Sequence, residues 1–428
     1  MTPPQAAPLP PARIVSLGLQ HVMVMYAGTV AVPLIVASMI GLTGGQTALL
    51  VDASLLTSGL ATLLQTLGLW RFGGRLPLIQ GCSFVMLSPL VLIGQRYGLP
   101  TVFGSAIACG LFTILAAPLF GRLLRFFPPL VIGCVITIIG ISLMPAAALW
   151  IGGGNPAAPG FGAPANLALG FATLALHCLT RGILRSFSIL SGMIAGTLAA
   201  LACGLCDFSA VGDAAWIGLA TPFAFGPPRF AAVPVLVACL GMLVVMTETT
   251  GNVLLIDRLL GRETTPLRLA DSLRADGLAS VLGGCLNSFP YNAFSQNAGL
   301  MMLTGVARRS VLVAAGLILI GLGLFPKLGA IVAAIPRPVL GGAGILMFGM
   351  TLAAGIRQLR EVDLDRDANM LVIAVSIGVG VLPMSLPRLF DAMPDAMRLI
   401  LDSGIFLGGL AAVLLNALLN RKGSPRLD

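Results

Sequence analysis

The chain has 428 residues, of which 57% are hydrophobic and only 10% are charged, and its mean hydropathy is +0.99. Ordinary soluble proteins carry about 25% charged residues, so this composition excludes a soluble globular or a disordered protein. The net charge of +9 does not indicate a nucleic-acid partner, because the basic residues are scattered singly and in pairs. A bilayer span takes about 20 apolar residues, and about 14 such spans would leave only loops between them.

Hydropathy predicts 14 membrane spans in chain order, and two regions of the pattern are weak. The segments 78–94 and 277–304 are interrupted by Gly, Pro and small polar residues. The predicted spans are 14–39, 46–69, 78–94, 101–121, 127–149, 166–180, 186–206, 233–256, 277–287, 292–304, 310–326, 339–356, 368–384 and 399–420.

The distribution of basic residues predicts the orientation of these spans. With both termini in the cytoplasm, 19 of the 25 Lys and Arg residues fall in inner segments and six fall in outer segments. Cytoplasmic loops of membrane proteins carry an excess of Lys and Arg, and loss of one span would exchange the sides of every later loop. The sequence therefore predicts a multi-pass protein of the inner (cytoplasmic) membrane with both termini in the cytoplasm.

Three landmarks recur in the two halves of the chain, at offsets close to half its length. A long apolar span begins near Ile14 and again near Val233, and a proline-led helix start at 128–133 recurs at 336–341. An interrupted segment at 76–89 (LPLIQGCSFVMLSP) recurs at 286–299 (LNSFPYNAFSQNAG). Seven spans per half is an odd number, so the halves would have opposite orientations, as in many transporters.

The interrupted segments predict non-helical backbone at membrane depth. Pro77 and Pro89 in the first segment, and Gly284, Pro290 and Gly299 in the second, disfavour a continuous helix. Such backbone persists in a membrane only where protein or a water-filled cavity satisfies its polar groups. We expect short strands that face half-helix starts, with N–H and C=O groups free to bind a ligand. The alternative is a pair of kinked packing helices.

Ionisable residues within the spans are candidates for function, because charges are costly in lipid. Glu248 lies well inside the eighth span, and the alternative role is that of a packing carboxylic acid. His21 lies in the first span, where packing is again the alternative. Asp276 opens the ninth span and is an N-cap, a functional residue or both. Asp52 and Asp402 lie near outer span ends, where water reaches.

Polar and aromatic residues around the deep carboxylate form a candidate site for a flat ligand. Carboxylate, amide side chains and strand backbone together offer a planar set of donors and acceptors. An aromatic face could cover a heterocycle, although plain core packing explains a Phe equally well. The residues concerned are Glu248 and Asn252 on one face of the eighth span, Phe84 in the first interrupted segment, and Phe294, Gln296 and Asn297 in the second.

The sequence contains none of the motifs on which a membrane enzyme or a metal site would depend. It has no P-loop, no GxSxG and no HExxH. The single CxxC, at Cys203 and Cys206, lacks a second pair or a nearby His. We therefore predict neither enzyme activity nor a bound cofactor or metal.

Five motifs in order resemble those of the nucleobase–ascorbate transporters, also called nucleobase–cation symporters. They are QHVMVMYAGTVAVPLIV in the first span, LPLIQGCSFVMLSP in the third, TETTGN in the eighth, LRADGLAS in the ninth and NSFPYNAFSQNAGLMMLTG in the tenth. The family signature, Gln/Glu/Pro-Asn-x-Gly-x-x-x-x-Thr-Arg/Lys/Gly, is matched in full from Gln296 to Gly305. The likeness covers about residues 13 to 420.

The resemblance implies an all-α integral membrane protein with 14 transmembrane segments in two inverted seven-span repeats and short β-strands in broken spans 3 and 10. Residues 14–125 and 233–330 would form a core domain, and residues 126–206 and 331–420 a gate domain. The core would move against the gate as an elevator, and the gate would also form a homodimer contact. Residues 1–13 would be a disordered cytoplasmic tail and 421–428 a second cytoplasmic tail.

The resemblance also assigns roles to residues. The binding carboxylate of the family matches Glu248, the neighbouring side chain of the tenth span matches Gln296, and aromatic cover matches Phe84. Within the matched motifs we add Asn297, Ser83 and Ser295 as candidate substrate-binding residues. The residues expected to support proton coupling are His21, Asp276, Asn252 and Gln20.

Gln296 favours a substrate within the family. Members with Gln at this position resemble xanthine and uric acid permeases, whereas uracil permeases tend to have Glu. We predict purine uptake (xanthine, uric acid or both) by proton symport, with sodium as the alternative ion. A uracil or pyrimidine permease, an anion carrier of the same fold and a passive channel remain alternatives. Many relatives carry Asp or His at the position of Asn252, which does not titrate near neutral pH, so Glu248 would have to carry the proton.

Overall fold

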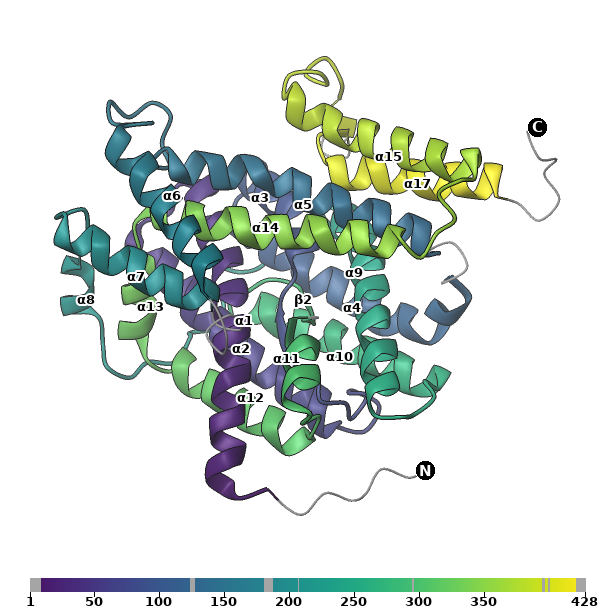
Figure 1. The fold of residues 1–428 in the computed structure, drawn as a ribbon, viewed down its shortest axis with the longest axis horizontal. Coiled ribbons are helices and arrows are strands. Elements are labelled where there is room, and N and C mark those ends of the chain that lie inside the picture. Colours follow the sequence, from purple (N-terminus) through teal and green to yellow (C-terminus); the bar gives the residue numbers. More distant parts are fainter. Residues whose placement is uncertain are drawn as a thin grey trace.

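The structure is a computed structural model that describes residues 9–123, 128–180, 188–206, 208–294, 296–394, 397–398 and 401–420. It is mostly helical (Figure 1). Within these described residues, seven helices are long and apolar enough to cross a membrane by length and composition. The predicted tails at 1–13 and 421–428 lie partly or wholly outside the described residues.

The helices of the first half follow the predicted spans closely, except that the third span is broken. Strand β1 and a 3₁₀ turn, η1, precede its helix. The elements are α1 (Pro11–Ile40), α2 (Gly44–Leu67), β1 (Gln80–Cys82), η1 (Phe84–Met86), α3 (Leu87–Tyr97), α4 (Leu99–Leu123), α5 (Pro129–Ile151), α6 (Pro164–Leu179), α7 (Ser188–Ala202) and α8 (Ser209–Asp213).

The second half departs from the predicted spans at two places. Its elements are α9 (Ala232–Leu259), α10 (Pro266–Cys285), β2 (Tyr291–Ala293), α11 (Gln296–Thr304), α12 (Arg309–Gly323), α13 (Pro326–Ala333), α14 (Arg337–Leu359), α15 (Asp367–Ser385) and α17 (Gly404–Leu419). Helix α10 begins well before the predicted residue 277, and the eleventh span bends by 79° between α12 and α13. Pro326 at the start of α13 accounts for the second break, since its missing N–H suits a helix start.

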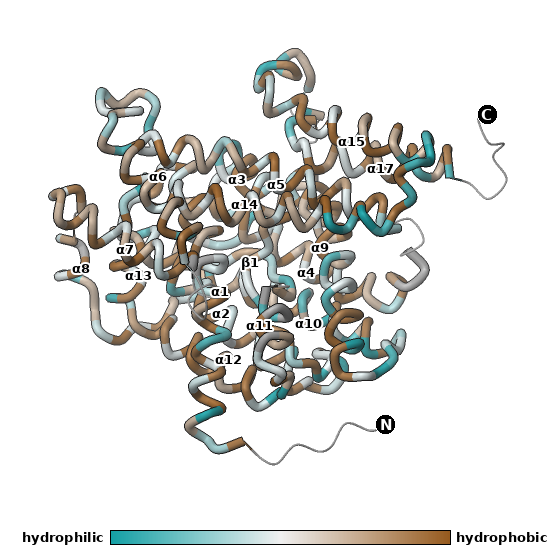
Figure 2. Tube along the Cα trace, in the orientation of Figure 1, coloured by the Kyte–Doolittle hydropathy of each residue, from teal (hydrophilic) through white to brown (hydrophobic). Residues whose placement is uncertain are grey.

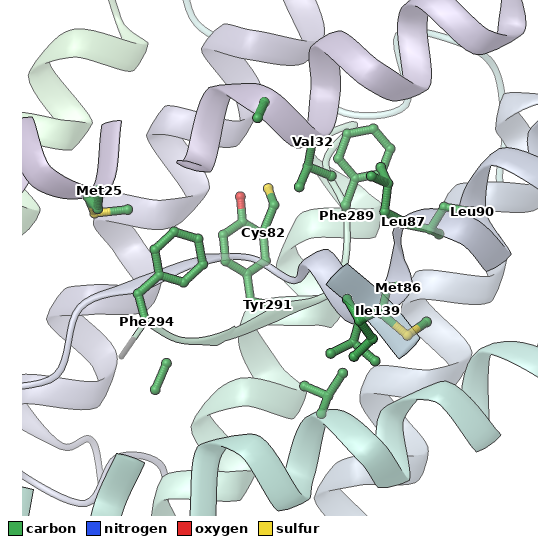
Figure 3. Close-up of a cluster of buried hydrophobic side chains, with 14 of the residues drawn as sticks. Met25, Val32, Cys82, Met86, Leu87, Leu90, Ile139, Phe289, Tyr291 and Phe294 are labelled. Carbon is green, nitrogen blue, oxygen red and sulfur yellow. The ribbon is translucent and has the colours of Figure 1, made fainter. Parts of the chain in front are cut away.

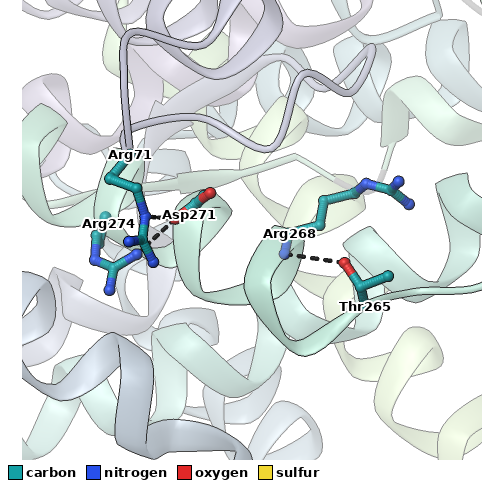
Figure 4. A network of polar contacts seen from close by, with 5 residues as sticks. All are labelled: Arg71, Thr265, Arg268, Asp271 and Arg274. Atoms are coloured by element: carbon teal, nitrogen blue, oxygen red, sulfur yellow. Dashed lines mark hydrogen bonds and ion pairs between the residues drawn. The ribbon is translucent and has the colours of Figure 1, made fainter.

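Charged residues explain why hydropathy placed the start of α10 too late. Asp271 accepts from Arg71 (3.3 Å) and from Arg274 (2.5 Å), so these charges are paired rather than solvated (Figure 4). Thr265 is the N-cap of the helix and accepts from the Arg268 backbone N–H at 3.2 Å. The N-cap alternative for Asp276 is therefore wrong, because Asp276 lies in the interior of α10.

The long helices pack in pairs through glycines. Helix α2 packs on α12, α4 on α10, α5 on α14 and α15 on α17, and the last two pairs run side by side in Figure 1. A Cβ at Gly110 would lie 2.6 Å from the Gly277 carbonyl oxygen, and one at Gly59 would lie 2.6 Å from that of Gly316. Backbones this close leave no room for a side chain, which is a common means of helix association in membranes.

Apolar side chains face outward along most of the helices, and the buried core surrounds the two short strands. Figure 2 shows hydrophobic colouring along the helices and hydrophilic colouring mainly in the connections. Around the strands, Tyr291, Phe289, Cys82 and Met86 are fully buried and cluster with side chains of α1 and α5 (Figure 3). The strands therefore lie inside the protein and not against lipid.

The glycine contacts predict a steric test of the fold. Gly110→Ala should destabilise the protein by about 1–3 kcal/mol, because the new methyl group overpacks the α4–α10 contact. Gly321→Ala is the matched control, since a Cβ there meets nothing within 4 Å. The apparent melting temperature in detergent is the measurement, and an equal response of the two variants would contradict the close packing.

Candidate functional site

The two interrupted segments meet as an antiparallel pair of strands. Gly81 of β1 lies opposite Asn292 of β2. The pairing continues beyond the strands, because the Ser83 N–H donates to the Pro290 carbonyl (2.9 Å) and the Phe294 N–H donates to the Ile79 carbonyl (3.0 Å). Segments about 210 residues apart in the chain thus satisfy each other's backbone groups at the centre of the molecule.

Side chains from the flanking helices bond the outward-facing groups of these strands. The Gln80 N–H donates to the Thr62 hydroxyl of α2 at 3.0 Å, and the Tyr291 N–H donates to the Ser280 hydroxyl of α10 at 2.9 Å. We expected such backbone groups to be free for a ligand. These are instead occupied, which anchors the strands to the helices.

Helix α9 forms hydrogen bonds with β2 through two residues one helical turn apart, Thr249 and Asn252. The Asn252 amide donates to the Ala293 carbonyl at 2.7 Å, and the Ala293 N–H donates to the Thr249 hydroxyl at 3.4 Å. Asn252 therefore has a structural partner in β2. This contact gives a physical reason for an amide at this position.

Glu248 precedes these anchors on α9 and contacts the same strand. Its Oε2 accepts from the Asn292 Nδ2 at 2.7 Å. A cavity of about 10 Å³ adjoins it, lined by Val85 of η1, by α5 and by α9. That volume is about the size of one water molecule. The carboxylate therefore lies where α9 and the strands face α5, in an arrangement too closed for a nucleobase.

Asp276 forms a second polar contact behind the strands. The Gln80 Nε2 donates to its Oδ1 at 2.8 Å, and both side chains are completely buried. The contact joins β1 to α10. Asp276, in the middle of α10, thus holds β1 through its hydrogen bond with Gln80.

His21 and Asn297 contact each other and join α1 to α11. The Asn297 Nδ2 lies 2.9 Å from the His21 Nδ1 and 3.0 Å from the His21 carbonyl oxygen. An amide NH₂ only donates, so Nδ1 is the acceptor and the ring proton lies on Nε2. Gln20, the residue before His21, is partly exposed.

The two matching phenylalanines stack on each other. The ring centroids of Phe84 and Phe294 are 6.2 Å apart with an interplanar angle of 22°, and Phe348 of α14 meets Phe84 edge-on at 6.3 Å. A Cβ at Gly81 would lie 2.6 Å from the Phe294 ring. The rings occupy space that the glycine leaves open, and they contact α14 through Phe348.

Not every predicted site residue can be placed. Ser295 and the side chain of Gln296 lie outside the described part of the chain. Ser83 is buried, and its hydroxyl has no hydrogen-bond partner among the described residues. Within those residues, no group of three or more His, Cys, Asp and Glu side chains could hold a metal ion.

Sequence reasoning did not identify Asn292, Gln80 or Thr249. A signal for Asn292 was present, since strand side chains alternate with a period of two and Asn292 therefore shares a face with Phe294. Gln80 and Thr249 gave no such signal, because each bonds to a residue far away in the chain.

A salt bridge joins α3 to the segment before α17. The Arg96 guanidinium donates to the Asp402 carboxylate at 2.7 Å, and Arg398 lies 3.4 Å from the same oxygen. Asp402 is thus paired, while Asp52, also expected near water, is only 7% exposed within α2. The Arg96–Asp402 contact spans the boundary predicted between core and gate.

Comparison with known proteins identifies the family. A family model described as a permease family matches residues 12–389. The chain is 44% identical to a xanthine permease of Bacillus subtilis over 95% of this chain and 94% of that protein. It is 43% identical to a uric acid permease of the same organism, with 97% of each chain covered. This chain belongs to the nucleobase–ascorbate transporter family. The predicted family is confirmed, and its members here are permeases rather than enzymes.

Solved structures show the fold class. The transmembrane domain of a cyanobacterial bicarbonate transporter, BicA, is 18% identical with a TM-score of 0.59, covering 94% of this chain and 97% of that one. A murine Solute Carrier 26 anion transporter in the inward-facing state is 14% identical with a TM-score of 0.65, covering 95% of this chain and 68% of that one. At such low identity the likeness shows a shared transporter fold alone. The family and the apolar spans together identify an integral membrane protein.

The Asn252 contact predicts a stability difference between two small substitutions. Asn252→Ala should cost about 1–3 kcal/mol, because the buried Ala293 carbonyl loses its donor. Asn252→Asp should cost more, since an ionised carboxylate would face that carbonyl. Melting temperatures in detergent measure both effects. Melting of either variant at the wild-type temperature would show that the contact does not hold β2.

Proposed function

We propose that this protein is a secondary active transporter that imports a purine nucleobase, xanthine or uric acid, by proton symport across the inner membrane. The observation that carries the proposal is the Glu248 carboxylate, which accepts from Asn292 of β2 at 2.7 Å, together with two stacked phenylalanines, Phe84 and Phe294, that follow the strand pair in the chain. A carboxylate accepts strongly from ring N–H groups, and aromatic faces suit a flat heterocycle. The relatives named as xanthine and uric acid permeases support this substrate class.

The proposed topology is 14 spans in two inverted seven-span repeats with both termini cytoplasmic. Seven long apolar helices, one bent pair and four shorter apolar helices, together with α10 and α11, agree with that number among the described residues. The packing supports the repeat, because α2 on α12 corresponds to α10 on α4, and α6 on α7 corresponds to α15 on α17. Arg71 and Arg274, both expected inside, share Asp271.

The proposed mechanism is alternating access by movement of the core against the gate, with the gate also making the homodimer contact. The small cavity beside Glu248 supports such movement, since its walls come from α9 and η1 of the core and α5 of the gate. A purine needs far more space, so these walls must separate for binding. Glu248 would carry the proton, with Asp276 and His21 assisting, because the Asn252 amide is bonded to β2.

Removal of the carboxylate tests the proposed substrate and its ion. Glu248→Gln should reduce uptake of radiolabelled xanthine or urate by about 10- to 100-fold, because a charge-assisted hydrogen bond is lost. Wild-type uptake should be concentrative and abolished by an uncoupler. Glu263→Gln is the matched control, since this Glu is exposed in the loop after α9.

Competition with a panel of xanthine, urate, hypoxanthine, guanine and uracil decides between the substrate classes. Preference for uracil would show that the substrate is a pyrimidine and not a purine. Sulfate or chloride exchange without nucleobase transport would favour an anion carrier, since the structurally similar proteins are a bicarbonate transporter and an anion transporter. Normal accumulation by Glu248→Gln would contradict the role of this residue.

The salt bridge between α3 and the segment before α17 offers a test of the movement. Cysteines at both positions, Arg96→Cys with Asp402→Cys, should be joined by a bifunctional thiol reagent that spans the removed side chains. Joining core to gate should abolish uptake, and a reductant that cleaves the reagent should restore it. The single-cysteine variants are the controls. Full transport by the cross-linked protein would show that these segments do not move apart.

A further inference from the structure

Asn292 is the residue of β2 that contacts the deep carboxylate. It lies in the middle of the strand, opposite Gly81, and is only 2% exposed. The residues on either side of it are fixed by hydrogen bonds from β2 to Ser280 and Thr249. The Asn292 side chain is thus presented to Glu248 from a backbone that is held on both sides.

The contact with Glu248 also determines which way the Asn292 amide faces. A carboxylate oxygen can only accept, so the Asn292 Nδ2 must face Glu248 and the Oδ1 must face away from it. That Oδ1 is buried and has no hydrogen-bond partner among the described residues. A buried acceptor without a donor is destabilising, and such atoms in native proteins call for an explanation.

We propose that Asn292 is a specificity-determining residue, which orients Glu248 through Nδ2 and accepts a ring N–H of the transported base with Oδ1. The inference rests on the proposed function, because it names how the same site selects among nucleobases. The Oδ1 and the Nδ2 that donates to Glu248 belong to one amide group, so the carboxylate and the Oδ1 are two acceptors separated by that Nδ2.

Two such acceptors select a particular edge of an oxopurine. In xanthine and urate, N1–H is separated from each neighbouring N–H by a carbonyl oxygen, which would repel the acceptors. The edge with N3 and N9 carries no carbonyl between its nitrogens and can present two N–H groups. Hypoxanthine and guanine lack a hydrogen on N3 in their usual forms. The geometry therefore favours neutral uric acid and the N9–H tautomer of xanthine, bound through the N3–N9 edge with one N–H to Glu248 and the other to Asn292.

Methylated substrates test this assignment, because each methyl group removes one N–H. Inhibition constants of xanthine and of 1-, 3-, 7- and 9-methylxanthine against radiolabelled xanthine uptake are measured for the wild type and for Asn292→Ala. In the wild type, 3-, 7- and 9-methylation should each weaken binding, because a methyl group on N7 leaves N9 without its hydrogen. In Asn292→Ala, either the penalty at N3 or the penalties at N7 and N9 should fall about tenfold, the equivalent of one hydrogen bond, and the penalty for 1-methylation should stay unchanged.

A role in positioning alone would give a different pattern. If Asn292 only holds Glu248 in place, Asn292→Ala would weaken all five ligands by one common factor, and the inference would be overturned. A changed penalty only at N1 would overturn it as well. Glu263→Gln is the control, since this Glu is exposed in the loop after α9. Its methylation penalties should equal those of the wild type.

A second variant covers a failure of Asn292→Ala to fold. Asn292→Thr suits a strand and shortens the polar group, so it should lower the same penalty. Unchanged ratios in that variant also overturn the inference. These outcomes are distinct from failure of the proposed function, in which the wild-type protein would neither bind nor accumulate any oxopurine.

Discussion

The structure depends on one constraint, the need to satisfy the backbone polar groups of two strands buried at membrane depth. In lipid, an unpaired N–H or C=O has no water to bond to. Here β1 and β2 satisfy part of each other's backbone, and side chains of α2, α9 and α10 bond several of the remaining groups. The two halves of the chain are thereby joined where their helices are interrupted.

The same bonds position the candidate binding carboxylate. Thr249 and Asn252 attach α9 to Ala293, and Glu248 is the residue immediately before Thr249. Attaching this turn of α9 to the strand brings Glu248 within hydrogen-bond distance of Asn292. Groups that hold the strand and the candidate binding carboxylate thus lie within one turn of α9. A change that loosens the strand would also displace the carboxylate.

Much of the fold and part of the site could be predicted from the sequence, for physical reasons that differ between residues. The apolar composition of the long helices predicts them directly, and Pro77 and Pro290 indicate where the third and tenth spans are interrupted. The start of α10 was predicted too late because Asp271 and Arg274 lower the hydropathy of its first turns, although these two side chains are paired in the structure. Asn292 was not identified because its partner lies 44 residues earlier in the chain, although the strand period of two places it on the same face as Phe294.

Asn252 shows how this chain could separate anchoring from proton transfer. An amide can donate to the Ala293 carbonyl at any pH, whereas an Asp or His at that position would gain and lose its donor as it titrates. The strand anchor would then change with every transport cycle that moved the proton. With Asn252 committed to the strand, the proposed proton site is Glu248, whose partner Asn292 presents an N–H to the ionised form. On this mechanism the strand stays fixed to α9 while the carboxylate beside it changes its charge.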